Sequence, residues 1–304
     1  MGERQALACL RRLMPPPPPG EVWAGDDAAV VQLPASSGLL LLASDCLVVG
    51  LDADLRLTTL ADLGWKAMAV NLSDIAAMGG RPLHAVVSVV GLNVQQLEEL
   101  YSGLLSAASH YSCPVVGGDL SSGREGVVNV AVTGWVDGPP VLRSGARPGD
   151  AIWVTGLLGA AAAGLRLLRA QRQEAPAELV LAHARPRAAL AEGQVARRSG
   201  ASAMIDVSDG LAADLKKLAE SSGVGFDLDE ERLPVAPGAT LDEALGGGDD
   251  YVLVFTARPD KDMHAAFRAT GLAPPYRVGS CTPELSQRTL GGRAFVAPGW
   301  EHPL

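Results

Sequence analysis

The feature that most constrains the fold is a Gly/Pro-rich joint near the middle of the chain. The stretch "GPPVLRSGARPGD", residues 138–150, ends a series of apolar segments, and a new strand-like pattern, "AIWVTG", begins directly after it. Clusters of Gly and Pro break regular elements and mark connections between them. A chain of 304 residues corresponds as a prior to about two domains. We therefore expect two domains, residues 1–148 and residues 149–304.

The N-terminal half alternates between strand-like and helix-like segments. Short β-type runs occur at 28–33, 38–49, 83–92, 113–119 and 126–136. Residues 58–79 carry an Ala/Leu/Met stripe typical of a long helix, which Thr58 or Thr59 could cap, and 94–110 predicts a second helix. The order β-β-α-β-α-β-β predicts an α+β unit with helices on one face of a sheet.

The C-terminal half predicts helices at 159–171, 186–199, 211–222 and 260–270, with strands "AIWVTG", "ASAMIDVSDG" and "YVLVFTA" between them. We interpret the stretch after residue 171 as a polar connection. Near the start of the chain, a helical pattern at 3–14 ends at the run Pro15–Pro19. Such a run is extended polyproline, which serves either as a stiff spacer or as a ligand for a proline-binding module.

Composition excludes several classes of protein. The chain is 48% apolar and 19% charged, as ordinary globular proteins are, and its net charge of −9 argues against nucleic-acid binding. No apolar run reaches the ~20 residues of a membrane span, and the first residues lack a signal-peptide pattern. The cysteines, at positions 9, 46, 113 and 281, have no metal-like spacing and indicate reduced thiols. We expect a cytoplasmic protein with neither membrane nor nucleic acid as a partner.

Acidic residues recur in one local pattern, beside glycine or serine at the end of a strand or the start of a helix. The pattern occurs in "GDDAAVV", "LLASDCLVV", "NLSDIAAMGG", "VVGGDLSS" and "MIDVSDGLAADL", and "GGGDDYVLVF" is close to it. Each acid alone could be a helix cap or a turn residue. The repetition, however, predicts that several carboxylates converge, and Asp74 on a helix that otherwise reads as buried needs such partners.

Clustered aspartates with serine hydroxyls and no histidine are the ligands of a hard cation such as Mg²⁺, which accepts phosphate oxygens as further ligands. A nucleoside triphosphate is the expected cargo. The chain has neither a GxxxxGK[ST] loop nor a kinase-type glycine loop with HRD and DFG motifs. Arg143, on the central joint, is the leading candidate to neutralise phosphate charge.

Together, the motifs "SDCLV", "GWKAMAVNLSDIAAMGGRP", "GGDLSS", "RSGARPGD", "DVSDGLAADL", "GGDDYVLVF" and "GWEH" resemble thiamine-monophosphate kinase, a branch of the ATP-binding superfamily that includes aminoimidazole-ribotide synthetase. The resemblance implies transfer of the ATP γ-phosphate to thiamine monophosphate, with several Mg²⁺ ions and no phosphoenzyme. It also implies a homodimer of two-domain α+β chains. In that fold, the N-terminal sheets pair into a barrel and an α/β sandwich follows.

The resemblance also assigns residues to roles. Catalytic roles fall on Asp209 and Arg143. The implied ATP contacts are Tyr101, Gly118, Asp119, Arg143 and Ser208. The implied acceptor contacts are Asp52, Asp249 and Trp300. The implied magnesium ligands are Asp27, Ser44, Asp45, Asp74, Asp119, Asp206 and Asp209.

The acceptor half departs from the family pattern at several points. Asp52 and Ala53 stand where the family has His-Phe, Asp249 replaces a glutamate, and Pro303 follows the terminal histidine. An aspartate in place of histidine adds repulsion beside a phosphorylated substrate unless a metal intervenes. Two alternatives therefore stand beside the kinase: a paralogue with another phosphorylated acceptor, and a non-catalytic nucleotide-binding dimer.

Overall fold

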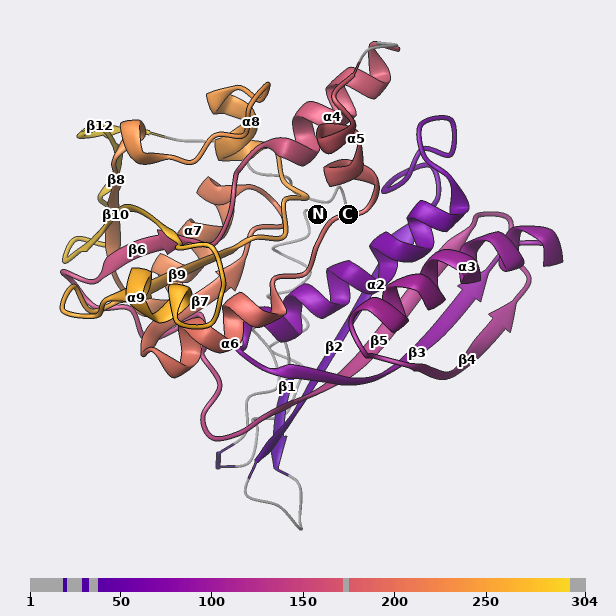
Figure 1. Ribbon diagram of the computed structural model, residues 1–304, viewed down its shortest axis with the longest axis horizontal. Coiled ribbons are helices and arrows are strands. Elements are labelled where there is room, and N and C mark those ends of the chain that lie inside the picture. Colours follow the sequence, from indigo (N-terminus) through magenta and orange to yellow (C-terminus); the bar gives the residue numbers. More distant parts are fainter. Residues whose placement is uncertain (1–18, 21–28, 33–37, 172–174, 296–304) are drawn as a thin grey trace.

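The structure is a computed structural model that describes residues 19–20, 29–32, 38–171 and 175–295. The predicted helix at 3–14, most of the proline run, and the predicted site residues Asp27 and Trp300 lie outside the described residues, as does Pro303. Within the described ranges the chain builds two β-sheets, each with its own helices (Figure 1).

The first sheet has strand order β1-β2-β5-β3-β4. Its neighbours pair antiparallel, except for the parallel pair β3 and β4. Two helices cover one face of this sheet (Figure 1). The predicted element order is confirmed. The bounds are β1 Ala29–Gln32, β2 Leu39–Val48, α2 Leu60–Ala77, β3 Arg81–Val90, α3 Val94–His110, β4 Val115–Ser121 and β5 Val127–Val136.

Helix α2 begins with a capping box, in which the Thr59 hydroxyl accepts from the amide of Asp62 at 3.0 Å and the Asp62 carboxylate accepts from the amide of Thr59. Thr59, one of the two predicted caps, is thus the cap. Most residues of α2 are buried because it packs against the first sheet, α3 and three elements of the second unit, α5, α6 and β7. A helix enclosed in this way aims its polar side chains at protein neighbours.

The second sheet has strand order β12-β11-β8-β10-β6-β9-β7. The predicted strands at 151–156, 201–210 and 251–257 are present, and the helix predicted at 211–222 has these bounds in the structure. The bounds are β6 Ala151–Val154, α4 Ala160–Arg169, α5 Ala177–Ala184, α6 Leu190–Arg198, β7 Ala201–Asp206, α7 Leu211–Ser222, β8 Gly225–Leu228, η1 Glu230–Arg232, α8 Leu241–Gly246, β9 Leu253–Ala257, α9 Met263–Arg268, β10 Tyr276–Thr282, β11 Arg288–Leu290 and β12 Arg293–Ala294.

The interpretation of the stretch after residue 171 as a polar connection was wrong in part, because α5 forms there. This short helix depends on tertiary packing: Leu179 is buried, and its backbone lies so close to α4 that a Cβ at Gly164 would lie 2.0 Å from the Leu179 carbonyl oxygen. An isolated helix of this length is not stable in water. Packing against α4 therefore supplies what local sequence cannot.

The end of α2 joins the two units. Ala76 and Ala77 belong to a buried cluster that also contains Val195, Leu253 and Phe255 from the second unit. Helix α2 thus has one face in the first core and its last turn in the second, which fixes the two sheets relative to each other. None of the helices in the described ranges is both long enough and apolar enough to cross a membrane.

Candidate active site

The polar face of α2 meets the end of strand β7. The buried Ser73 hydroxyl donates to Oδ2 of Asp206 at 2.7 Å. Asp206 is the last residue of β7 and is 5% exposed. The next residue on the helix, Asp74, is half-buried. The acid on this buried helix is therefore adjacent in sequence to a residue, Ser73, that joins the two units.

Two of the acidic motifs form neighbouring loops. The amide of Asp249 donates to the carbonyl of Ser208 at 2.8 Å, and the amide of Tyr251 donates to the carbonyl of Val207 at 2.9 Å. The loops follow β7 and precede β9, which are adjacent strands. The "DVSDG" and "GGDDY" motifs are thus held side by side by backbone hydrogen bonds.

Asp249 is fixed by two side chains. Its Oδ2 lies 2.6 Å from the ammonium of Lys66, a buried residue of α2, and its Oδ1 accepts from the Tyr251 hydroxyl at 3.0 Å. Burial alone would raise the pKa of Asp249, but the Lys66 charge holds it below its usual value. This ion pair connects the two units at the predicted acceptor site.

The same loop is strained. Asp249 and Tyr251 have φ values of +62° and +50°, a region that costs non-glycine residues about 1–3 kcal/mol each. Such strain persists only where surrounding contacts enforce it. The Lys66 ion pair and the Tyr251 hydroxyl supply those contacts. The conformation of this loop is therefore fixed by specific side chains.

The charges of three carboxylates act on the Tyr251 hydroxyl, and one of these acids, Asp249, accepts a hydrogen bond from it. Burial raises the pKa of Tyr251 well above its usual value, and the charges of Asp249, Asp45 and Asp206 raise it further. These acids come from the "GGDDY" loop, from β2 and from the end of β7. Two predicted magnesium ligands, Asp45 and Asp206, therefore act electrostatically on the same side chain that Asp249, a predicted acceptor contact, binds directly.

The loop after β7 is organised by an acid that sequence analysis did not assign a role. Asp214 is fully buried and accepts from the amides of Ser208 and Asp209 at 3.0 and 2.9 Å. Burial raises the pKa of Asp214 to about 6, although the neighbouring Lys217 lowers it. Lys217 also forms a short ion pair with Asp209. This acid lies in the first turn of α7, within the motif "DGLAADL". Acidic residues near a helix N-terminus often bind backbone amides, so the sequence position could have suggested this role.

The second aspartate of "GGDDY", Asp250, binds backbone amides, whereas the first binds side chains. Oδ2 of Asp250 accepts from the amide of Gly159 at 2.6 Å and Oδ1 accepts from the amide of Ala161, at the start of α4. Burial raises the pKa of Asp250 to about 7. Asp250 thus anchors the loop to α4, while Asp249 faces the junction.

His183 is a further residue of this region that sequence analysis did not identify. Its Nδ1, on α5, lies 4.0 Å from Oδ2 of Asp249 and is buried without a hydrogen-bond partner among the described residues. Burial and the Lys66 charge lower the pKa of His183 to about 4, while Asp249 acts in the opposite direction. The imidazole is therefore neutral at physiological pH.

Asp119 does not join Asp45 within one chain. It pairs with Ser88, which lies in a row with Asn129 and Cys46 across β3, β5 and β2. Three strand spacings amount to about 14 Å. Side chains alternate along a strand, so Asp119 shares a face with Cys46 and Asp45 lies on the other face.

The remaining predicted residues have local partners or exposed positions. Oδ2 of Asp52 accepts from the amide of Val48 at 2.7 Å and closes the turn after β2. Ser44 is exposed and contacts Asn129, and Tyr101 packs against the first core. Arg143 lies half-buried in the β5–β6 connection. The roles assigned to these residues stay predictions.

Gly118 on β4 is required by close packing, because a Cβ there would lie 1.8 Å from the carbonyl oxygen of Val87. No group of three or more His, Cys, Asp or Glu side chains in the described ranges is arranged as a metal site. The described carboxylates therefore form pairs and loose clusters rather than a protein-only cage.

Comparisons with known proteins agree with this architecture. Residues 25–136 match the family model of the AIR synthase related protein N-terminal domain, and residues 147–289 match the corresponding C-terminal domain. Thiamine-monophosphate kinase of Methanospirillum hungatei is 36% identical over 308 residues, covering 99% of each chain. The chain belongs to the thiamine-monophosphate kinase family.

Members of this family and of the wider fold appear among solved structures. The structure described as AaThiL complexed with AMPPCP and TMP is 31% identical, with a TM-score of 0.87 over 99% of this chain and 97% of that one. The hydrogenase maturation protein HypE of Escherichia coli, at 20% identity and a TM-score of 0.71 over 85% of this chain and 86% of its own, shares the fold. The family resemblance inferred from the motifs is thus confirmed.

Proposed function

We propose that this protein transfers the γ-phosphoryl group of ATP to the phosphate of thiamine monophosphate, giving thiamine diphosphate and ADP. The observation that carries the proposal is the match, over 99% of the chain, to a family structure complexed with an ATP analogue and TMP. The acids around Tyr251, at the junction of the two units, offer the charge pattern that phosphoryl transfer through metal ions needs.

We infer that Mg²⁺ ions link these carboxylates to the phosphates. The donor set fits, because Asp45, Asp206 and the neighbouring Ser73 offer oxygen atoms only. Mg²⁺ is usually held by one or two carboxylates, waters and substrate phosphates, which agrees with the loose clusters described here. Bound magnesium would supply positive charge to the phosphate oxygens. The proposed ligands remain Asp27, Ser44, Asp45, Asp74, Asp119, Asp206 and Asp209.

The protein's own side chains position the reactants. Asp249, held by Lys66, offers a carboxylate to the cationic thiazolium, and Trp300 offers an aromatic face to the same ring. Arg143 and Asp209 are assigned to the phosphate end, where the Asp214 carboxylate fixes the backbone of the loop. Positioning of this kind accounts for most of the catalysis in phosphoryl transfer.

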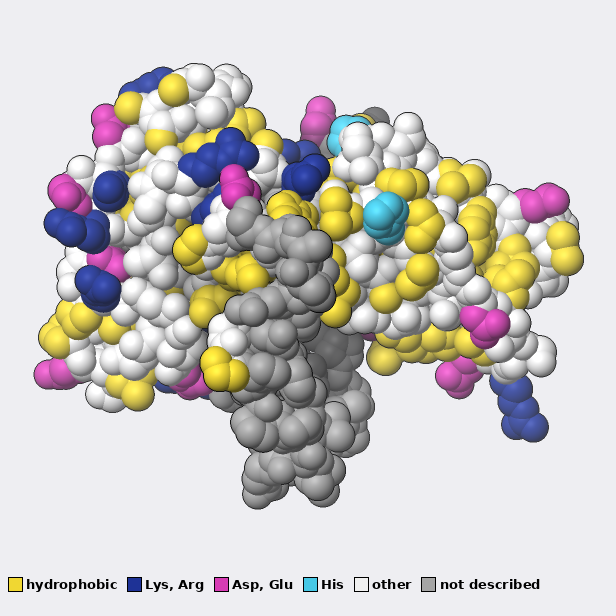
Figure 2. Space-filling view, turned by 90° about the horizontal axis from the view of Figure 1, so that it is seen from below, with side chains coloured by type: hydrophobic (Ala, Val, Ile, Leu, Met, Phe, Trp, Pro, Cys, Tyr) yellow, Lys and Arg dark blue, Asp and Glu magenta, His cyan; other side chains and the backbone are white. Residues whose placement is uncertain are grey.

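We also propose that two copies pair through the N-terminal sheets into a barrel. The sheet face opposite α2 and α3 exposes apolar side chains, including Leu42 at 38% and Val86 at 44%. Figure 2 shows apolar side chains spread over the N-terminal part of the molecule, on its right. Contiguous exposed apolar surface is typical of an interface.

Two further assignments belong to this proposal. The domain boundary is placed at residues 148 and 149, inside the connection between β5 and β6. A cytoplasmic location is supported by the free thiols of Cys113 and Cys281, because such environments keep cysteines reduced.

The decisive test is ADP formation in a coupled assay with Mg²⁺ and ATP. We expect release of ADP only when thiamine monophosphate is present, equimolar thiamine diphosphate by mass spectrometry, and loss of both with EDTA. Turnover with another phosphate monoester but not with thiamine monophosphate would favour the paralogue. Magnesium-dependent nucleotide binding without turnover would favour a non-catalytic dimer.

A further inference from the structure

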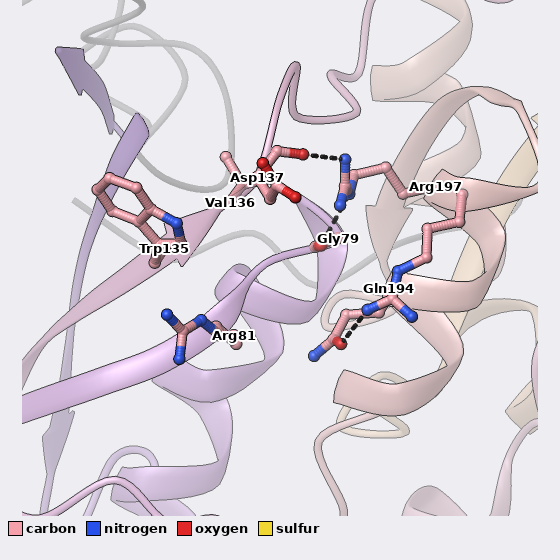
Figure 3. Close-up of a pocket in the computed structure, with 8 residues that line it drawn as sticks. Gly79, Arg81, Trp135, Val136, Asp137, Gln194 and Arg197 are labelled. Atoms are coloured by element: carbon pink, nitrogen blue, oxygen red, sulfur yellow. Dashed lines mark hydrogen bonds between the residues drawn. The ribbon is translucent and has the colours of Figure 1, made fainter. Parts of the chain in front are cut away.

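A polar cavity lies at the C-terminal end of α2, where strands of the first sheet face helix α6 (Figure 3). Its volume is about 140 Å³, equal to that of several water molecules at about 30 Å³ each. Residues of both units line it, and three of them are arginines. The lining residues used below are Gly79, Arg81, Trp135, Asp137, Arg197 and Arg198.

Arg197 is held rigidly at the wall of this cavity. Its Nε donates to the carbonyl of Gly79 at 3.2 Å and its Nη1 donates to the carbonyl of Asp137 at 2.7 Å (Figure 3). Gly79 has φ +68°, and a Cβ there would lie 2.7 Å from the Cβ of Arg197. Within the described ranges, Nη2 of Arg197 makes no hydrogen bond, so a fixed donor is left for a ligand.

Two further arginines line the cavity, and Figure 3 shows the Arg81 side chain extending away from Arg197. Arg81 is exposed at the start of β3, opposite Trp135 of β5. Nη2 of Arg198 donates to Oε1 of Gln194 at 3.0 Å, and Nε2 of Gln194 donates to the carbonyl of Gly80 at 3.2 Å. Arg198, the last residue of α6, is thus linked through Gln194 to the backbone of the first unit.

The charges at the cavity are unbalanced. Three arginines face one aspartate, Asp137, among the lining residues, so two positive charges remain on a protein whose net charge is −9. Two effects lower the pKa of Arg197: burial is the larger, and repulsion from the charge of Arg198 is the smaller. An anion placed between these groups would remove that repulsion.

We propose that this cavity binds a tetrahedral oxyanion of the size of inorganic phosphate at Arg197 and Arg198 of the second unit, and that the exposed Arg81 side chain of the first unit turns toward the bound ion. Guanidinium groups bind phosphate and sulfate through paired, charge-assisted hydrogen bonds. The volume accommodates such an anion with a water molecule or two. Because the arginines come from both units, occupancy stabilises the contact between α2 and α6.

The test measures phosphate binding without divalent ions, because the acidic cluster around Tyr251 repels anions when no metal is present. Wild-type protein in EDTA, at constant ionic strength set with chloride, is titrated with inorganic phosphate and, in a second arm, with glycerol 3-phosphate. Thermal denaturation and tryptophan fluorescence are recorded. We expect a saturable rise in Tm and a saturable fluorescence change, and the Trp135→Phe variant loses only the fluorescence change. Binding of inorganic phosphate alone identifies a free ion as the ligand, and binding of both identifies a phosphate group in general.

Variants locate the site. Arg81→Gln and Arg198→Gln should each weaken the apparent affinity about tenfold. Asp137→Asn, which keeps the backbone carbonyl that Arg197 uses, should strengthen it. Arg268→Gln, an exposed arginine on α9, is the matched control and should titrate like wild type. The proposal is overturned if phosphate and chloride give the same curves, or if the Arg81 and Arg198 variants bind as wild type does.

Discussion

The carboxylates of the C-terminal loops and those of the N-terminal sheet differ in how the protein holds them. In the loops, Asp206 accepts from Ser73, Asp249 pairs with Lys66, and Asp209 pairs with Lys217. On the sheet, Asp45 and Asp119 are exposed on their strands and accept from close neighbours in sequence, Asp45 from the amide of Cys46 and Asp119 from the Ser121 hydroxyl at 3.2 Å. A carboxylate bonded to a side chain of another element keeps its geometry without a ligand, whereas an exposed carboxylate with a local contact is more readily ordered by what binds to it. The C-terminal part of the site is thus more preorganised than the N-terminal part.

The largest expected effect comes from Asp74, which follows Ser73, the partner of Asp206, on α2. Replacing Asp74 with Asn should lower kcat by about two orders of magnitude or more, because it removes a charge that holds the ions bridging to the phosphates. The isosteric change should leave Tm nearly unaltered. Glu98→Gln, on the exposed surface of α3, is the control. Near-normal kcat in D74N would remove Asp74 from the site.

The next prediction concerns Asp119, which the register places on the opposite sheet face from Asp45. If the sheets pair as proposed, Asp119 serves the site of the second copy. Asp119→Asn and Asp74→Asn should each be nearly inactive alone. Unfolding and refolding them together should restore about a quarter of wild-type activity, because half of the dimers are mixed and each mixed dimer contains one intact site.

The measurement is specific activity after refolding, against each variant refolded alone. No recovery in a mixture that forms dimers by analytical ultracentrifugation would mean that Asp119 acts within its own chain or not at all. In that case, the exposed sheet acids would need another explanation.

A third prediction tests the preorganised part through Lys66 and Asp249. Lys66→Met should destabilise the protein by about 1–3 kcal/mol, because Asp249 keeps partial contact with water. Asp249→Asn should cost more, since it leaves the buried ammonium unpaired. Both variants should raise KM for thiamine monophosphate more than KM for ATP.

Chemical denaturation and steady-state kinetics measure these effects. The double variant, with neither charge, should be more stable than Asp249→Asn alone, and Lys66→Arg should retain part of the acceptor affinity. Equal changes in both KM values would show that the pair only supports the fold.

The smallest effect is a pH dependence of stability at His183. Its pKa is lowered from 6.5 to about 4 in the folded protein, so the unfolded chain binds a proton more readily between these values. Folding stability should therefore fall as the pH drops from 6.5 to 4, by up to about 2–3 kcal/mol. Above pH 6.5 this group makes no contribution.

Comparing wild type with His183→Gln isolates this contribution, because the opposite effects of Asp214 and Asp250, whose pKa values are raised, are common to both proteins. Lys66→Met should reduce the pH dependence, since Lys66 helps to lower the pKa of His183. Parallel stability curves for wild type and His183→Gln between pH 4 and 6.5 would contradict the assignment.

Much of the fold followed from periodicity and capping. The helix at 94–110 and the Thr59 cap are confirmed, because strongly amphipathic segments and capping boxes are encoded within a few residues. The helix α5 and the strands β8 and β10 were not predicted. These short elements depend on neighbours distant in sequence, such as the α4 backbone against Leu179.

For the site, the repeated acid-and-glycine pattern predicted that several carboxylates converge. In the structure, the charges of Asp45, Asp206 and Asp249 all act on Tyr251, and the metal-ligand roles stay predictions. The pattern did not reveal their partners. Lys66 is, like Asp74, a charged residue on a buried helix. The same argument would have predicted that Lys66 needs an acidic partner. His183 gave no local signal, because its proximity to Asp249 depends on how α5 packs.

By itself, the sequence determined the two-part organisation, the family and the oxygen-rich character of the site, since these depend on composition, local pattern and residue type. Only the tertiary structure decided which acids form ion pairs with Lys66 or Lys217. It also decided which arginines of the two units line the polar cavity beside α6. The physical reason is range: propensity and capping act over a few residues, whereas charge compensation acts between atoms that only folding brings within a few ångströms.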